Sequence, residues 1–166
     1  MAIRPFSTTG IPTAADLMQT ELLHVAPECS LYEAARMMAT HHVSGLPVID
    51  AQGRAVGVIT LADLAAVWLK ESRQEASDLN FYRNLFGHSP ELASYFASFY
   101  ADDAVVTVAD AMTPKVLHTP ENTVATDIVK LMQANHVHRL FVSRDGRLVG
   151  VVTTTDVMQA LLRLVG

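Results

Sequence analysis

Two stretches with the pattern Gly-x-x-Thr-x-x-Asp that stand between a strand-like run and a helical pattern are the residues of this sequence best suited to binding a ligand. They occupy residues 57–63 and 150–156. In each copy the pattern follows an apolar, β-branched run and precedes an apolar helical pattern, so it stands where a strand leads into a helix. The polar side chains concerned are Thr60, Asp63, Thr153 and Asp156.

This spacing has a structural and a functional interpretation. A threonine at a helix N-cap accepts a hydrogen bond from a backbone N–H, and a carboxylate three residues later suits the positive end of the helix. The same helix end with its hydroxyl can bind phosphate, and the carboxylate can accept hydrogen bonds from a ribose diol. The two roles can coexist, so the pattern predicts a cap and a candidate nucleotide contact.

A basic pair, His138 and Arg139, precedes the second pattern, whereas the first copy has Ser44 and Gly45 at the equivalent positions. An arginine guanidinium matches two phosphate oxygens at once. The alternative is a solvated arginine beside a partly buried histidine. Because only one copy carries the basic pair, we expect two non-equivalent ligand positions that favour one or two phosphates.

The other histidines and the cysteine are weaker candidates. His41 and His42 are adjacent and would point in different directions at a helix end, which is poor spacing for a metal. His24 and His118 recur near the first strand of each copy, where we expect them to satisfy backbone groups. Cys29 has no repeated counterpart, and the sequence has no Ser-His-Asp order, catalytic carboxylate pair or Gly-rich phosphate loop. We therefore expect no catalytic residues and no metal site.

The composition limits the classes of partner. Of 166 residues, 50% are hydrophobic and 17% charged, which is typical of a chain with a core. Lys and Arg number 12 against 17 Asp and Glu, and the net charge of −5 argues against nucleic-acid binding. The apolar stretch at 55–69 is too short and polar for membrane insertion, and a single cysteine suits a reducing compartment. These features predict a cytoplasmic protein.

An internal repeat determines the domain organisation. Residues 108–113 match residues 14–19, which lie 94 positions earlier, and residues 146–156 match residues 53–63 at an offset of 93. Because the offset changes by only one residue, the sequence consists of two copies of one unit.

Each copy predicts the same order of elements: strand, helix, strand, strand, helix. The first helix is predicted from apolar stripes, which are Leu31, Ala34, Ala35 and Met38 in one copy and Val124, Ile128, Leu131 and Met132 in the other. Two strands follow around a glycine turn, at 46–50 with 54–60 and at 140–143 with 147–153. The closing helices are predicted from Leu61, Leu64, Ala65 and Trp68, and from Val157, Leu161 and Leu164.

These features resemble a tandem pair of cystathionine-β-synthase (CBS) domains, also called a Bateman module. The resemblance rests on the openings Ala-Asp-Leu-Met and Ala-Asp-Ala-Met, the strand at 45–50 and the duplicated Gly-x-x-Thr-x-x-Asp, in the same order twice. It covers nearly all of residues 12–165 except an insertion. It implies a mixed α/β (α+β) fold of two pseudo-symmetric βαββα repeats packed sheet to sheet.

The resemblance also implies roles for individual residues. In CBS pairs that bind adenosine compounds, the threonine approaches phosphate or ribose and the aspartate holds the ribose hydroxyls. The segment at 135–140 is similar to one in the nucleotide-sensing gamma subunit of AMP-activated protein kinase, where a His-Arg pair contacts phosphates. The expected ligand contacts are Thr60, Asp63, Thr153, Asp156, His138, Arg139, Gly45, Leu46 and Pro47.

An insertion at 71–106 separates the first repeat, at 10–70, from the second, at 107–165. It holds seven of the eleven aromatic residues, Phe81, Tyr82, Phe86, Tyr95, Phe96, Phe99 and Tyr100. Helical spacing and a helix start at Ser89-Pro90 predict a helical hairpin. The hairpin is interpreted as a lid or self-association face, or else as a docking surface for a partner.

The predicted function is that of a stand-alone regulatory module, not an enzyme. It would bind an adenine nucleotide (AMP, ADP or ATP) in the clefts between its repeats, as a regulatory ligand and not as a catalytic cofactor. It would then act on an effector protein in trans by shifting conformational populations. The resemblance also implies a homodimer. The alternatives are a ligand-free structural module, and a module for S-adenosylmethionine or NAD.

Overall fold

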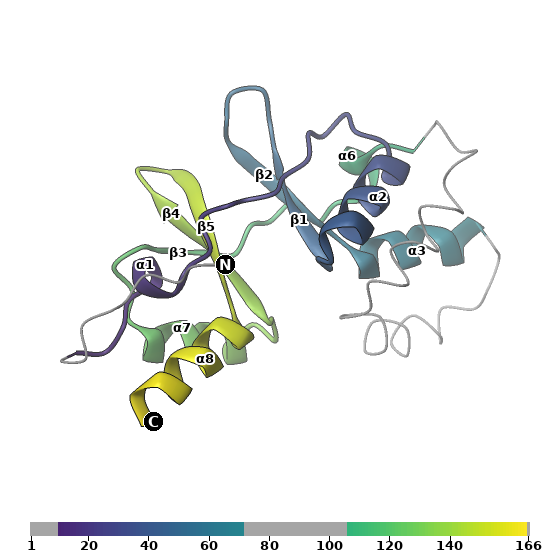
Figure 1. Ribbon diagram of the computed structural model, residues 1–166. Coiled ribbons are helices and arrows are strands. Elements are labelled where there is room, and N and C mark those ends of the chain that lie inside the picture. Colours follow the sequence, from purple (N-terminus) through teal and green to yellow (C-terminus); the bar gives the residue numbers. More distant parts are fainter. Residues whose placement is uncertain (1–9, 72–105, 166) are drawn as a thin grey trace. The chain divides into compact units, whose positions relative to one another are not determined.

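A computed structural model describes residues 10–71 and 106–165 (Figure 1). The described residues form two compact units. Unit 1 contains those up to Leu22 together with those from Leu117 onward, and unit 2 contains those from Leu23 to Val116. The aromatic residues of the predicted hairpin lie outside the described residues.

Unit 2 is built on an antiparallel hairpin packed against helices (Figure 1). Its elements are α2 (Leu31–His41), β1 (Gly45–Ile49), β2 (Ala55–Thr60), α3 (Leu61–Glu71) and α6 (Val108–Ala111). The turn between the strands holds Gly53 at a φ of 78°, a conformation that glycine adopts without strain. The predicted first strand of this repeat is reduced to one parallel bridge between Val25 and Val48.

Unit 1 has a three-stranded sheet in the order β3-β4-β5. Its elements are α1 (Ala14–Leu17), β3 (His118–Pro120), α7 (Ala125–Ala134), β4 (Arg139–Arg144), β5 (Arg147–Thr153) and α8 (Thr154–Val165). Strand β3 is parallel to β4, and β4 and β5 form an antiparallel hairpin. From β3 onward this is the predicted strand, helix, strand, strand, helix order. The mixed α/β class with two small sheets is confirmed, while the packing of one sheet on the other stays a prediction.

Each unit takes its opening segment from the other sequence repeat. In unit 1, Gln19 bridges Val151 of β5 through two backbone hydrogen bonds of 2.9 and 3.0 Å. In unit 2, Thr113 bridges Val58 of β2 through two bonds of 3.0 Å. A short helix with an acidic residue thus lies beside the hairpin of the opposite repeat in both units.

Gly57 and Gly150, which begin the patterns at 57–63 and 150–156, make room for these opening segments. A Cβ atom on Gly150 would lie 2.7 Å from the carbonyl oxygen of Gln19 and 2.8 Å from the sulfur of Met18. A Cβ atom on Gly57 would lie 2.6 Å from the sulfur of Met112 and 2.8 Å from the Thr113 carbonyl oxygen. These distances are too short for real Cβ contacts, so close packing explains the glycine of both patterns.

The helical stripes are confirmed in the first repeat and partly wrong in the second. Leu31, Ala34, Ala35 and Met38 are all buried in the core of unit 2. In α7, Ile128 and Met132 are buried but Leu131 is 36% exposed. In α8 the buried side chains are Asp156 and Ala160, whereas Leu161 is 59% exposed. The predicted stripe is right at Val157, which packs against the core of unit 1, but one turn later Ala160 takes the core side and Leu161 points to water.

Candidate functional site

Thr60 and Asp63 form a capping box at the start of α3. The backbone N–H and the hydroxyl of Thr60 both donate to Asp63 Oδ2, at 2.8 and 2.6 Å. The backbone N–H of Asp63 lies 3.3 Å from Thr60 Oγ1. The structural interpretation of this pair is confirmed.

Thr153 and Asp156 repeat this geometry at the start of α8. The Thr153 backbone N–H and hydroxyl donate to Asp156 Oδ2 at 2.7 and 2.6 Å, and the Asp156 backbone N–H lies 3.3 Å from Thr153 Oγ1. Both motifs therefore hold one carboxylate oxygen, Oδ2, against the helix end and leave the other, Oδ1, for different partners.

The Oδ1 atoms of Asp63 and Asp156 lie next to two side chains that were not predicted from the sequence. In unit 1, Gln19 Nε2 donates to Asp156 Oδ1 at 3.0 Å. In unit 2, the Thr113 hydroxyl lies 3.5 Å from Asp63 Oδ1. Positions 19 and 113 are 94 residues apart and end the repeated opening stretches, which is the signal that could have paired them. Asp156 is only 3% exposed, whereas Asp63 is half-buried.

Two further Thr-x-x-Asp capping boxes were not foreseen, nor was the box of Ser30 with Glu33 at the start of α2. Thr13 with Asp16 and Thr107 with Asp110 make the same bonds at the starts of α1 and α6, with hydroxyl-to-carboxylate distances of 2.8 and 2.6 Å. Hydrogen bonds from Thr107 lower the pKa of Asp110. The Thr-x-x-Asp spacing thus serves as a cap in four places, and the box alone does not mark a ligand site.

Arg139 is the residue that sets the unit 1 motif apart. It begins β4 directly opposite Thr153 in the antiparallel ladder, so the two side chains lie on the same face of the sheet. Arg139 is half-buried, and desolvation lowers its pKa from the ordinary value, although an arginine remains charged at neutral pH. The carbonyl of the exposed His138 accepts a hydrogen bond of 3.1 Å from Thr154 N at the start of α8.

The equivalent strand of unit 2 carries no charge at this place. Gly45 lies opposite Thr60, and Pro47 follows on the same face of β1 because side chains alternate along a strand. Leu46 points to the other face and is 1% exposed in the hydrophobic core. Gly45 and Pro47 thus share the face of Thr60, while the Leu46 side chain does not.

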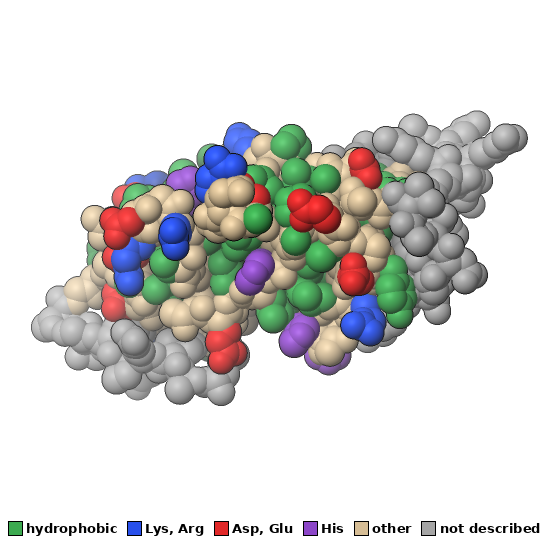
Figure 2. All heavy atoms as spheres, turned by 90° about the horizontal axis from the view of Figure 1, so that it is seen from above, with side chains coloured by type: hydrophobic (Ala, Val, Ile, Leu, Met, Phe, Trp, Pro, Cys, Tyr) green, Lys and Arg blue, Asp and Glu red, His purple; other side chains and the backbone are tan. Residues whose placement is uncertain are grey.

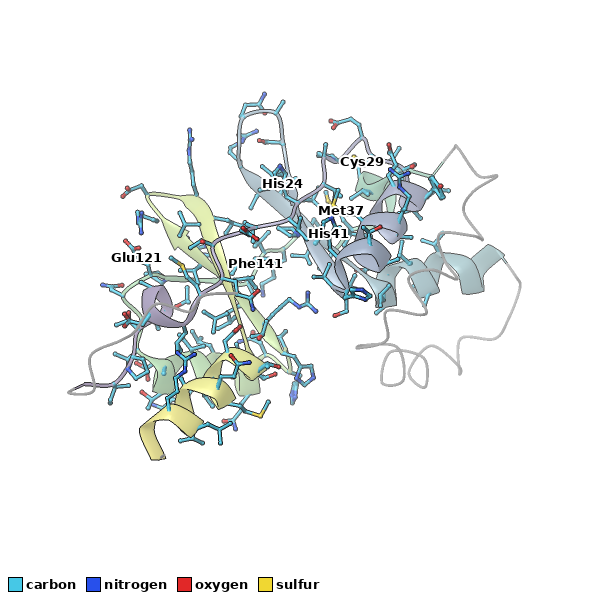
Figure 3. All side chains as sticks on the ribbon, viewed as in Figure 1. His24, Cys29, Met37, His41, Glu121 and Phe141 are labelled. Atoms are coloured by element: carbon cyan, nitrogen blue, oxygen red, sulfur yellow. The ribbon has the colours of Figure 1, made fainter. Side chains whose placement is uncertain are left out.

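The remaining candidates are spread apart. Cys29 and His41 lie at opposite ends of α2 (Figure 3). His118 Nδ1 lies 3.0 Å from the Ser143 hydroxyl, a side-chain contact in place of the predicted backbone one. In the part of the chain that the structure describes, no three His, Cys, Asp or Glu side chains are grouped to hold a metal.

The charged side chains are mixed on the visible surface. On the face in Figure 2, Lys and Arg side chains are interspersed with Asp and Glu. The described residues also include the ion pair of Arg144 with Glu121, in which hydrogen bonding to Arg144 lowers the pKa of Glu121. The basic residue at the candidate site, Arg139, is distinguished by its place opposite Thr153.

Comparison with known proteins identifies the architecture. The family model of the CBS domain matches residues 14–70 and 108–163, more than half of the chain. The chain belongs to the CBS domain family. The predicted tandem pair of CBS domains is thereby confirmed.

Two curated relatives show how CBS pairs occur in longer proteins. CBS domain-containing protein CBSX2, chloroplastic, from Arabidopsis thaliana is 30% identical over 161 residues, which are 92% of this chain and 64% of that protein. Inosine-5'-monophosphate dehydrogenase from Methanocaldococcus jannaschii is 26% identical over 151 residues, which are 90% of this chain but 24% of the enzyme. The chain therefore spans just under two thirds of the first relative and about a quarter of the second.

Two solved CBS structures match the fold. The crystal structure of CBSX2 in complex with AMP has a TM-score of 0.67 and 27% identity, covering 93% of this chain and 99% of that one. The CBS domain pair of protein MJ0100, in complex with 5'-methylthioadenosine and S-adenosylmethionine, has a TM-score of 0.64 and covers 93% and 98%. Its 19% identity supports the fold alone.

Among residues 10–71 and 106–165, no helix is long and apolar enough to cross a membrane. CBSX2 is described as chloroplastic, so the cytoplasmic localisation of this chain stays a prediction.

Proposed function

We propose that this CBS pair is a regulatory module that binds an adenosine-containing ligand, with AMP, ADP and ATP as the candidates. The AMP complex of CBSX2 supports this proposal, because that chain shares 27% identity and 93% coverage with this one. The ligand would act as an effector of the module and not as a cofactor of catalysis.

The observation that carries the proposal is the grouping of Arg139, Thr153 and Asp156 at one end of unit 1. Arg139 and Thr153 are opposite each other in the ladder, and Asp156 is hydrogen-bonded to Thr153. A guanidinium suits a phosphate, and a carboxylate oxygen suits a ribose hydroxyl. In this assignment Arg139 with His138 contacts phosphate, and Asp156 accepts from ribose.

Unit 2 offers the ribose half of this arrangement. Thr60 and Asp63 have the same box geometry, with Gly45 and Pro47 on the same face of the strand. Since Gly45 replaces the arginine, this position would recognise the nucleoside more than its phosphates. The backbone of Leu46 would be its only contribution to a ligand, because its side chain is in the core.

Removing each carboxylate separates the two positions. Calorimetry with AMP compares the wild type with Asp63→Ala, Asp156→Ala and the double variant. The free energy of AMP binding at the affected position should become less favourable by roughly 1.5–3 kcal/mol, the contribution of a hydrogen bond to a charged group. The ribose assignment is wrong if all three variants bind AMP as the wild type does.

A second adenosine ligand class comes from the complex of protein MJ0100 with 5'-methylthioadenosine and S-adenosylmethionine. Both ligands carry a ribose but no phosphate, so they would use Asp63 or Asp156 without Arg139. Thermal shift with AMP, ATP, NAD and S-adenosylmethionine distinguishes the classes, because a ligand at 100 times its Kd stabilises by about 2.7 kcal/mol. No shift with any of them would favour a ligand-free structural module.

Signalling to an effector protein would follow from differential affinity. A ligand shifts a conformational equilibrium only by the difference in its affinity for the two states. Ligand binding would thus change the population of the state that a partner protein recognises in trans.

A further inference from the structure

We propose that Gln19 is a specificity-determining residue that lowers the affinity of the Asp156 position for an adenosine ligand; this inference rests on the proposed function. Its basis is the contact between Gln19 Nε2 and Asp156 Oδ1 at 3.0 Å. Gln19 comes from the opening segment of the chain, 137 residues away from Asp156 in sequence.

Both oxygens of the Asp156 carboxylate accept hydrogen bonds from the protein. Oδ2 accepts from the backbone N–H and the hydroxyl of Thr153, at 2.7 and 2.6 Å. Oδ1 is the remaining oxygen, and it accepts from Gln19. Because Asp156 is 3% exposed, a ribose hydroxyl that donates to Oδ1 has to displace or share the Gln19 amide.

Gln19 is held in place by its backbone. Its N–H and carbonyl bond Val151 of β5 at 2.9 and 3.0 Å, and its carbonyl oxygen packs over Gly150. The side chain therefore starts from a fixed point beside the sheet and reaches Asp156 without a change of the main chain. Only the side-chain torsions of Gln19 have to be ordered for its amide to occupy Oδ1.

Unit 2 supplies an internal comparison. Thr113 has the same backbone bridge, to Val58, but its shorter side chain ends 3.5 Å from Asp63 Oδ1. That distance is at the outer limit of a hydrogen bond, whereas the Gln19 bond is of ordinary length. The opening segments thus differ: Gln19 places an amide donor at ordinary hydrogen-bond length from Asp156 Oδ1, whereas the Thr113 hydroxyl stays at the outer limit from Asp63 Oδ1.

Exchanging the two residues tests the inference. In an Asp63→Ala background, which leaves the Asp156 position, Gln19→Thr should lower the Kd for AMP roughly 10-fold, since a competing hydrogen bond to a charged acceptor is removed. Gln19→Met, which keeps the chain length without the amide, should act in the same way and guards against a packing effect. In an Asp156→Ala background, Thr113→Gln should raise the Kd for AMP by a similar factor.

The matched control is Gln19→Thr in the Asp156→Ala background, where the Kd should not change because the acceptor is gone. Weaker or unchanged binding of AMP by both Gln19 variants with Asp156 present would overturn the inference and leave the proposed function standing. If the wild-type protein binds no adenosine ligand at all, the proposed function and the inference both fail.

Discussion

At the residue scale, the hydrogen bonds of the two threonines divide the roles within the site. The hydroxyl protons of Thr60 and Thr153 are already donated to Asp63 and Asp156 at 2.6 Å. A phosphate oxygen needs a donor, so these hydroxyls cannot serve it while the capping boxes are closed. In the proposed site, the phosphate contacts would therefore come from Arg139 with His138 and not from these hydroxyls.

The first prediction follows from this division. Replacing Arg139 with Ala should raise the Kd for AMP roughly 10-fold or more, since a charge-assisted contact is lost, and should leave the Kd for adenosine unchanged. Calorimetry with both ligands measures this, and Arg139→Lys is the control that keeps the charge but not the planar donors. Equal losses for AMP and adenosine would mean that Arg139 supports the fold and not the phosphate.

Some of these residue contacts could be read from the sequence and some could not. The box of Thr60 with Asp63 is a local pattern, so spacing alone predicted it correctly. Thr13 with Asp16 obeys the same rule and lies in a further Gly-x-x-Thr-x-x-Asp stretch, at 10–16. The bond from Gln19 to Asp156 spans 137 positions, and no local pattern encodes it.

At the element scale, the exchange of opening segments explains the duplicated glycines. Each segment bonds to the outer strand of a hairpin at the point where Gly57 or Gly150 removes the side chain. The segment that ends in Gln19 or Thr113 is thereby brought to the carboxylate at the next helix start. The glycines at 57 and 150 therefore affect both the backbone packing and the side chain that reaches the carboxylate of the candidate site.

This coupling gives a stability prediction. Gly150→Ala should lower the free energy of unfolding by roughly 1–3 kcal/mol, because its Cβ would be 2.7 Å from the backbone oxygen of Gln19 and backbone yields less readily than a side chain. Denaturant unfolding measures the change. Gly10→Ala is the matched control, since no atom lies within 4 Å of the added Cβ. A Gly150→Ala protein as stable as the wild type would contradict the close packing.

Periodicity predicted the elements better than it predicted their buried faces. The stripe from Leu31 to Met38 was correct because four apolar residues share one face and no polar residue competes for it. In α8 the cap carboxylate of Asp156 turns inward to Gln19, and this fixes the phase of the helix. Leu161 is consequently exposed although it is apolar.

At the scale of the whole molecule, two similar repeats carry two dissimilar candidate ligand positions. Arg139 and Gln19 belong to unit 1, whereas unit 2 has Gly45 and Thr113 at the equivalent places. A nucleotide with phosphates would gain affinity from Arg139 and lose affinity through Gln19. An adenosine compound without phosphates would bind more tightly to the position in unit 2. Such a difference would let one chain respond differently to two adenosine ligands, which suits a regulatory module.

The last prediction is that the chain is a homodimer. The resemblance to CBS pairs implied it, and α8 offers an apolar stripe that a second copy would cover: Met158, Leu161 and Leu162 are 56, 59 and 73% exposed. These residues lie at i, i+3 and i+4, so they share one face, and such a stripe can pack on itself across a twofold axis.

Light scattering coupled to size exclusion should therefore give about twice 18.0 kDa for the wild type. Replacing Leu161 and Leu162 together with Ser should shift the protein toward a monomer, because the apolar area that drives association is lost. The control is Ile11→Ser, which alters an equally exposed apolar residue, 60%, outside the helix. A monomeric wild type would disprove the dimer. A dimer that survives the α8 change would move the interface elsewhere, and the double variant Phe96→Ser with Phe99→Ser would then test the aromatic insertion, whose residues lie outside the described ranges.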